Sequence, residues 1–279
     1  MKKKNKWSTF ALLLVFFVGL SVMLYPTVSR YWNARNQSEA IVDYEKMLQQ
    51  ATPEDYSKEF AAADAYNQSL RKLPFPLTEY EAVAGYEEIL DLNGTGMMGY
   101  LTIDKIHLEL PLYHGTDEKV LSSAVGHLKG TSLPVGGSGT HAVVSAHRGL
   151  PSATLFTNLD HLEEGDTFRI TVCDRTLTYL VDQIKTVSPT DTADLRPVAG
   201  QDYCTLLTCT PYGINSHRLL VRGVRIETVE QNKIYVTSDA QRIDVLIVTT
   251  VVALPMLFTL MMIVLFKPVK KDPMGDDLE

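Results

Sequence analysis

Cys209 and Arg218 are residues of this sequence whose types and spacing could support nucleophilic chemistry. Cys209 lies near the end of the β-prone run CTLLTCT, and Arg218 follows nine residues later, in the run HRLLVRGVRI. The residues between these runs, PYGINS, include Pro, Gly and Asn, which favour turns, so the simplest interpretation is a β-hairpin. If its midpoint lies between Gly213 and Ile214, Cys209 and Arg218 are directly opposite each other on one face.

This pairing permits two interpretations of Cys209: a nucleophile or a buried apolar residue. A guanidinium beside the sulfur would favour the thiolate, which is the reactive form of cysteine. The same guanidinium could equally stabilise the oxyanion that forms when a carbonyl is attacked. The hairpin geometry therefore allows a nucleophile at this position without requiring one.

A nucleophilic cysteine needs a base, and seven histidines compete for that role. His147 ends the alternating run HAVVSAH and precedes the loop residues RGLPS, a position where functional groups are commonly displayed. The alternatives are His127, in a stretch flanked by glycine, and His217, which adjoins Arg218. In a regular strand His217 would point away from Arg218, which argues against it.

Two uncharged apolar segments, residues 7–25 and 245–266, are each long enough to cross a hydrocarbon core of about 30 Å. Pro255 in the second segment is tolerable, because neighbouring groups in a membrane helix can satisfy the freed carbonyl. A cleaved signal peptide is the alternative for the first segment. That segment is longer than a usual signal core, and no small-x-small cleavage site follows it closely. We therefore predict an N-terminal anchor within residues 1–25 and a C-terminal transmembrane helix at 245–266.

Lysines outside these two segments predict the orientation of the chain, because lysine excess marks the cytoplasmic side of a membrane. We expect both termini, including the tail 267–279, to be cytoplasmic and residues 26–244 to lie outside the cell. The whole 279-residue chain has a formal net charge of -7, and the segment 26–244 is more acidic still because seven lysines lie beyond it. Such a domain is unsuited to binding nucleic acid or to adhering to anionic lipid. The lysines are Lys2, Lys3, Lys4, Lys6, Lys267, Lys270 and Lys271.

The extracytoplasmic segment contains all three cysteines, Cys173, Cys204 and Cys209. An odd number in an oxidising compartment leaves at least one thiol unpaired. A disulfide between Cys173 and Cys204 would leave Cys209 as the free thiol.

The residue composition and the spacing of apolar residues change along this extracytoplasmic segment. Residues 26–92 contain good helix formers at helical spacing, which predicts a helical N-terminal extension. Residues 93–230 contain short alternating runs of β-formers bounded by Gly, Pro and Asp, which predicts a closed antiparallel barrel or sandwich. Residues 231–244 are expected to link this mainly β domain to the C-terminal span.

Three stretches closely resemble the sortases, specifically the class C, pilin-polymerising group of Gram-positive bacteria. The stretches are SAHRGLPSATLFTNLDHLEEGDTF, TLLTCTPYGINSHRLLVRG and AVGHLKGTSLPVGG, and the resemblance extends from about Gly99 to Ile226. It implies a closed sortase-type β-barrel with N-terminal helices, flanked by two transmembrane helices. Carried over residue by residue, it implies that Cys209 is the nucleophile, His147 its acid/base partner and Arg218 the oxyanion-stabilising group, with no cofactor and no metal.

The activity implied by this resemblance is transpeptidation at the cell membrane. Such an enzyme cleaves an LPXTG-like sorting signal between Thr and Gly through a Cys thioester, and joins pilin subunits through a lysine amine. The alternative within the family is anchoring of surface proteins or pili to the cell-wall peptidoglycan, where a wall peptide supplies the amine. A non-catalytic surface-binding protein is the alternative from another class. The expected partners are pilins with LPXTG-like signals and the membrane, and not nucleic acid.

The sequence departs from the class C pattern before the barrel. Class C enzymes usually carry a lid with an Asp-Pro-aromatic motif that covers the catalytic cysteine. The Asp-Pro pair of this chain, Asp272 and Pro273, lies in the C-terminal tail instead. In the expected region Leu73, Pro74 and Phe75 could present an aromatic ring without the aspartate. They are the candidate lid, and a helix-breaking linker is the alternative, so we expect Cys209 to be more accessible than in a typical relative.

Overall fold

The computed structural model describes residues 6–228 and, closer to the C-terminus, residues 253, 255–256, 258–259 and 262. The chain divides into two compact units: residues 1–28 together with 234–279, and residues 29–233. The second unit contains the barrel and all three cysteines.

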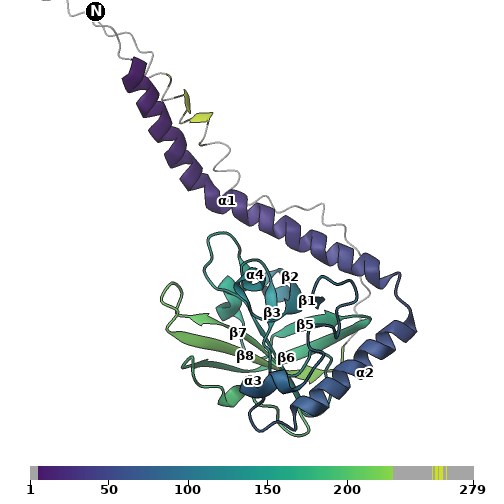
Figure 1. Cartoon of the computed structure of the whole chain (residues 1–279). Helices are drawn as coiled ribbons and strands as arrows, with labels where there is room; N and C mark the ends of the chain where they lie inside the picture. The colour runs from purple at the N-terminus through teal and green to yellow at the C-terminus, as the bar shows by residue number, and fades with distance from the viewer. Residues whose placement is uncertain (1–5, 229–252, 254, 257, 260–261, 263–279) are drawn as a thin grey trace, which may run out of the picture. The chain divides into compact units, whose positions relative to one another are not determined.

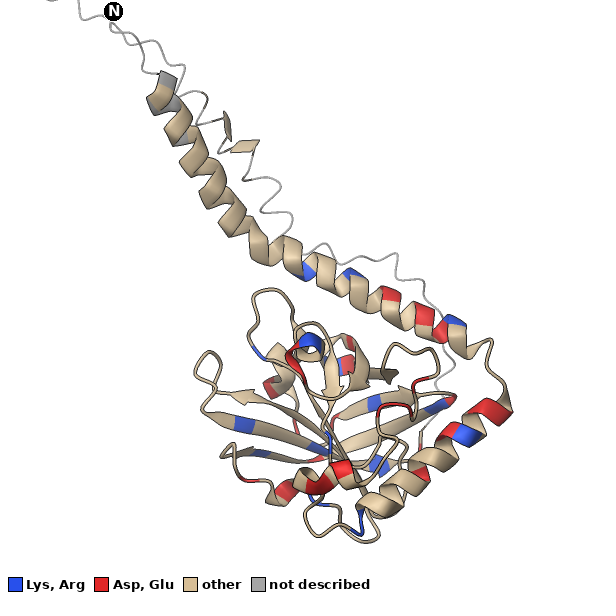
Figure 2. Cartoon of the chain, viewed as in Figure 1, with Lys and Arg blue, Asp and Glu red and all other residues tan. Residues whose placement is uncertain are grey.

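Helix α1 (Lys6–Leu48) runs through Pro26 without interruption. Between Lys6 and Arg30 it carries no charge, and the charged residues coloured in Figure 2 occupy its second half. Leu13–Leu48 is the one helix within the described residues that is long and apolar enough to cross a membrane. The boundary expected at residue 25 is thus not a helix end. A proline removes one hydrogen bond from a helix without necessarily stopping it.

The second predicted span, 245–266, lies largely outside the described residues, as do the predicted linker 231–244 and the tail 267–279. The residues of that span that the structure does describe are all helical: Ala253, Pro255, Met256, Phe258, Thr259 and Met262. A second transmembrane helix therefore stays a prediction.

The predicted mainly β domain is a closed barrel with the strand order β1-β2-β3-β4-β7-β8-β6-β5 (Figure 1). The closed barrel is confirmed. The strands are β1 (Met97–Ile103), β2 (Leu108–His114), β3 (Val125–His127), β4 (Thr140–Ser145), β5 (Thr167–Val172), β6 (Arg175–Val187), β7 (Asp202–Thr210) and β8 (His217–Ile226).

The expectation that the barrel is antiparallel throughout is wrong, because β2 pairs with β3 and β4 with β7 in parallel. Short strands with close turns indicate hairpins, but a parallel pair needs a crossover connection. Between β4 and β7 that connection is the whole β5–β6 hairpin with its flanking loops. Strand neighbours so far apart in sequence leave no local signal.

The predicted helical extension is only partly helical. Besides α1 it contains α2 (Pro53–Leu70), α3 (Pro76–Glu79) and the 3₁₀ turn η1 (Tyr80–Ala82). Helix α2 begins with a capping box in which Thr52 and Asp55 bond each other's backbone N–H, so its start is fixed locally. The remaining helical elements lie in the barrel's connections: η2 (Asp104–Ile106), α4 (Glu118–Leu121), η3 (Leu155–His161) and η4 (Ala193–Leu195).

One apolar core joins α2 to the barrel. Alternate residues of the strands point into this core, as the pleat of a half-buried strand requires. On β4 and β7 they include Ala142, Val144, Cys204 and Leu206, all almost completely buried. One face of α2 contributes Phe60, Ala63, Tyr66 and Leu70 to the same cluster.

Tyr44 attaches the second half of α1 to the barrel. Its side chain is completely buried, its hydroxyl donates to the Met98 carbonyl at 2.8 Å, and it accepts from the Cys173 N–H at 2.9 Å. One hydroxyl thus satisfies a backbone carbonyl at the start of β1 and a backbone N–H in the β5–β6 turn.

Removing this hydroxyl should destabilise the fold. We expect Tyr44→Phe to lower the free energy of unfolding by about 1 to 3 kcal/mol, because a buried N–H and a buried carbonyl lose their partner. The full chain in detergent can be unfolded thermally beside Tyr31→Phe, which removes a hydroxyl from an exposed tyrosine of the same helix. Equal stability of the two variants would contradict the docking role of Tyr44.

Candidate active site

The β7–β8 hairpin has the register that its sequence predicts. Thr210 pairs with His217, and Cys209 pairs with Arg218. Because directly opposed residues of an antiparallel pair point to the same side, the thiol and the guanidinium share one face. The prediction that the turn lies between Cys209 and Arg218 is confirmed.

That face is the outside of the barrel. Leu206 points into the core, whereas Leu207 belongs to a separate apolar cluster on the other face of the sheet. Cys209 lies two residues after Leu207 and therefore on the same outer side, where it is half-buried. The residues of this outer cluster are Val143, Leu195 and Leu220, with Leu128, Val187 and Leu207 packed against them.

His147 lies at the level of Cys209 on the neighbouring chain segment. The last ladder pair between β4 and β7 joins Ser145 to Leu207. Beyond it, the Ala146 N–H donates to the Leu207 carbonyl at 3.3 Å, and the Thr208 hydroxyl donates to the Ala146 carbonyl at 2.8 Å. His147 is the next residue after Ala146, so continuing this register would place it at the level of Cys209.

The side chains of this group are not yet joined by hydrogen bonds. Within the described residues, the Cys209 sulfur bonds neither His147 nor Arg218. The Arg218 guanidinium donates to the turn carbonyls of Asn215 at 3.3 Å and His217 at 3.1 Å. His147 Nε2 lies 3.3 Å from Glu118 Oε2, a partner on α4 that the sequence did not reveal. Catalytic contacts are often long in a free enzyme and shorten when substrate binds.

The two alternative histidines do not face Cys209. His127 is completely buried, with Nδ1 accepting from the Tyr86 hydroxyl at 2.9 Å and Nε2 donating to the Ser132 carbonyl at 2.8 Å. Burial lowers the pKa of His127 to about 4, so it stays neutral. His217 is exposed, bonds the Ser216 hydroxyl and alternates with Arg218 along β8.

All three cysteines are free thiols. Cys173 and Cys204 are buried, whereas Cys209 is partly exposed. Burial raises the pKa of the Cys173 thiol to about 12 and holds that of Cys204 well above its usual range. Of the three thiols, Cys209 is therefore the one placed to react.

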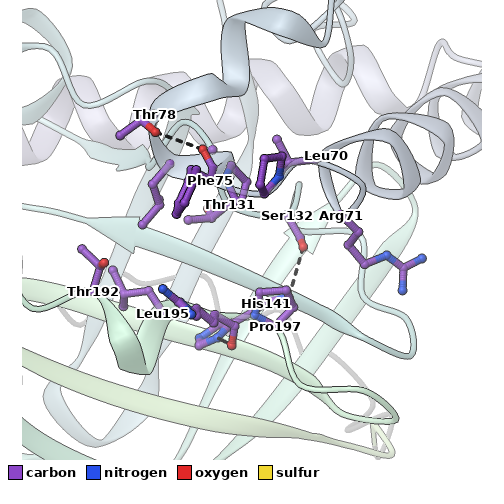
Figure 3. Close-up of a pocket in the computed structure, with 15 residues that line it drawn as sticks. Leu70, Arg71, Phe75, Thr78, Thr131, Ser132, His141, Thr192, Leu195 and Pro197 are labelled. Atoms are coloured by element: carbon purple, nitrogen blue, oxygen red, sulfur yellow. Dashed lines mark hydrogen bonds between the residues drawn. The ribbon is translucent and has the colours of Figure 1, made fainter.

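The candidate lid lies away from Cys209. Phe75 is 63% exposed and lines a cavity of about 150 Å³ that also includes His141 and Leu195 (Figure 3). Neither Cys209, His147 nor Arg218 lines this cavity. His141 pairs with Tyr203, six residues before Cys209 along β7, which corresponds to about 20 Å of strand.

The segment around Phe75 is nevertheless held against the barrel. The Thr78 hydroxyl donates to the Phe75 carbonyl at 3.1 Å, which closes the short turn of α3 (Figure 3). A Cβ on Gly130 would lie 2.6 Å from the Pro76 carbonyl oxygen, so this chain approach requires glycine. Leu73 packs on the core and Pro74 lines the cavity. Pro74 and Phe75 thus line a cavity at the far end of the outer face, and Cys209 is not among the residues that line it.

Comparison with known proteins identifies the family of this chain. The Sortase domain family matches residues 101–226. The structure of sortase C1 from Streptococcus agalactiae superposes with a TM-score of 0.64 and 47% identity, over 68% of this chain and 100% of that chain. The chain belongs to the sortase family. Sortase C-1 from Actinomyces oris is similar with a TM-score of 0.58 and 45% identity, over 63% of this chain and 100% of that chain.

A more distant relative is Sortase D of Bacillus subtilis, which is 32% identical over 131 residues. That match covers 46% of this chain and 63% of the relative, less than two thirds of its length. The class C structural neighbours confirm the class predicted from the sequence. This protein is therefore a class C sortase and a cysteine transpeptidase.

The partial exposure of Cys209, together with the position of Phe75 in a separate cavity, predicts rapid chemical labelling in this sortase. We expect a small thiol reagent to label Cys209 at similar rates in the parent chain and in Phe75→Ala, because Phe75 lines a cavity that excludes Cys209. Mass spectrometry of the full chain in detergent measures both rates. Cys209→Ser is the control, because the other two thiols are buried. A slow parent that Phe75→Ala accelerates by orders of magnitude would mean that a firm lid exists.

Proposed function

We propose that this sortase polymerises pilins, with Cys209 as nucleophile, His147 as acid/base and Arg218 as oxyanion-stabilising group. The observation that carries the proposal is the pairing of Cys209 with Arg218, and the β4–β7 register that leads to His147 supports it. The similarity to solved structures of sortase C1 supports the same assignment.

The first half-reaction forms an acyl-enzyme. The Cys209 thiolate attacks the Thr carbonyl carbon of an LPXTG-like signal, and a C–S bond forms. His147 gives a proton to the departing glycine amine as the Thr–Gly bond breaks. The threonyl thioester stays on Cys209 while the remainder of the signal leaves.

The second half-reaction transfers the acyl group. A lysine amine of the next pilin attacks the thioester, His147 takes a proton from that amine, and an amide bond replaces the C–S bond. The thiol of Cys209 is thereby regenerated. Each half-reaction passes through a tetrahedral oxyanion, which the planar fork of Arg218 is suited to hold.

The partly exposed edge of the outer apolar cluster, which includes Leu207, is a candidate contact for the Leu-Pro part of the signal. In an extended peptide these residues lie two and three positions before the Thr, about 7 to 10 Å from the attacked carbonyl. Leu207 is two residues from Cys209 on the same face, and Leu220 and Leu195 adjoin it. A peptide along the strands would therefore place its apolar residues on this cluster and its Thr carbonyl at Cys209.

Membrane attachment completes the proposal. The apolar first half of α1 would anchor the enzyme, with the barrel extracellular and both termini in the cytoplasm. Pilin precursors and this sortase would then meet at the outer surface of one membrane. The second span, 245–266, is part of this proposal.

The catalytic assignment predicts the behaviour of three substitutions. Cys209→Ala and His147→Ala should abolish transpeptidation, and Arg218→Lys should lower kcat by about 100-fold because a point charge cannot reproduce the guanidinium fork. The full chain is incubated with an LPXTG-type peptide, and mass spectrometry monitors a thioester on Cys209.

Arg225→Lys is the matched control, because Arg225 lies on the same strand but the opposite face from Arg218. Near wild-type turnover by His147→Ala would refute the role of His147.

Supplying either a pilin lysine or a wall peptide as the amine then separates the two sortase functions. Resolution by the wall peptide alone would favour anchoring over polymerisation.

A further inference from the structure

Arg148, the residue after His147, has a buried side chain that the reaction scheme does not use. Only 9% of the side chain is exposed. One guanidinium nitrogen, Nη2, forms an ion pair with Asp160, and the other, Nη1, donates to the Thr210 hydroxyl at 3.3 Å. Its Nε is buried and has no hydrogen-bond partner among the described residues.

These two partners place the Arg148 guanidinium between η3 and the end of β7. Thr210 directly follows Cys209 on β7, and Asp160 lies on η3. Arg148 itself directly follows His147. The Arg148 guanidinium therefore connects the segment that carries His147 to the strand that carries Cys209. This Thr210–Arg148–Asp160 contact is called the bridge below.

The pairing of β4 with β7 holds this segment only as far as Ala146. The last ladder pair between β4 and β7 is Ser145 with Leu207, so His147 lies two residues beyond the paired part of β4. Backbone bonds hold its loop to η3: the Phe156 N–H donates to the His147 carbonyl at 3.1 Å, and the Gly149 N–H to the Thr157 hydroxyl at 3.2 Å. Neither of these two bonds reaches β7. The bonds of Ala146 reach β7 on the side before His147, and the Arg148–Thr210 bond reaches it on the side after His147.

The composition of the bridge is unusual for a purely structural contact. A buried guanidinium with an unpartnered Nε loses more hydration than an apolar side chain of the same size, and apolar packing would stabilise the fold at least as well. Arginine supplies what an apolar residue cannot, two donors fixed in one plane that point at two partners.

We propose that Arg148 is a positioning residue that fixes the separation of His147 and Cys209 by bridging Thr210 and Asp160. The proposal rests on the proposed function, since it assumes that these two side chains react together. Displacement of a reacting group by about 1 Å can lower a rate about 100-fold. Loss of the bridge could therefore lower the rate of thioester formation strongly.

The bridge can be broken at either end without removing the charge of residue 148. Thr210→Val keeps the shape of the side chain but removes the hydroxyl that accepts from Arg148, and Arg148→Lys keeps a cation for Asp160 but cannot reach both partners. We expect each to lower the kcat of thioester formation at least 10-fold with KM changed by less than about twofold. Thr210→Ser keeps the hydroxyl and should restore most of the rate. Arg169→Lys, at an exposed ion pair with Asp104 on another face, is the matched control.

A double-mutant cycle on the full chain in detergent decides between positioning and stability alone. The variant with both Arg148→Lys and Thr210→Val should be no slower than the slower single variant, because the two changes break one bond. Additive losses would overturn the proposal. So would losses that merely follow the folded fraction in a thermal unfolding curve.

Failure of this proposal is distinguishable from failure of the proposed function. If Cys209→Ala is inactive while Thr210→Val and Arg148→Lys keep the wild-type kcat, the catalytic assignment stands and the bridge has no positioning role. If Cys209→Ala still forms product, the catalytic assignment fails and the positioning proposal falls with it.

Discussion

Strand β7 is the constraint on which the site depends, because it is paired on both sides. Its antiparallel partner β8 places Arg218 opposite Cys209, and its parallel partner β4 brings His147 alongside. A shift of either register by one residue would turn the outer set of side chains to the core. The inward residues Cys204 and Leu206 oppose such a shift, since it would remove them from the apolar core. The core of the barrel and the geometry of the site therefore share one register.

The sequence could predict half of this arrangement. A hairpin register follows from turn residues and alternation, both local, so the Cys209–Arg218 pair was accessible without the family resemblance. The β4–β7 pairing was not, because the two strands are parallel and the β5–β6 hairpin separates them along the chain. For that reason the residues alone left His127 and His217 open beside His147. Burial, which sequence patterns indicate poorly for a single histidine, separates His127 from the other two.

The candidate lid shows a second limit of local signals. A Leu-Pro-aromatic stretch before the barrel is compatible with a cover over the cysteine, yet its placement depends on where α2 ends and which loop receives it. The end of α2 is packed in the core through Leu70. The lack of a side chain at Gly130 lets the backbone at Pro76 approach closely. These contacts hold the stretch over the start of β4, about 20 Å of strand from Cys209.

The loop that carries His147 is held from two directions, which sets it apart from an ordinary surface loop. From the barrel side, η3 and β7 hold it through the backbone of His147 and the side chain of Arg148. From the other side, the charged half of α1 holds it, because Arg30 donates to the Pro151 carbonyl at 3.0 Å and Asn33 to the Ser152 carbonyl at 2.9 Å. Loops without such contacts open at little cost in free energy. A domain that begins after these α1 residues lacks both outer bonds, so its His147 loop is less constrained than that of the full chain. Kinetic measurements on variants of His147 and Cys209 should therefore use a chain that contains the whole of α1.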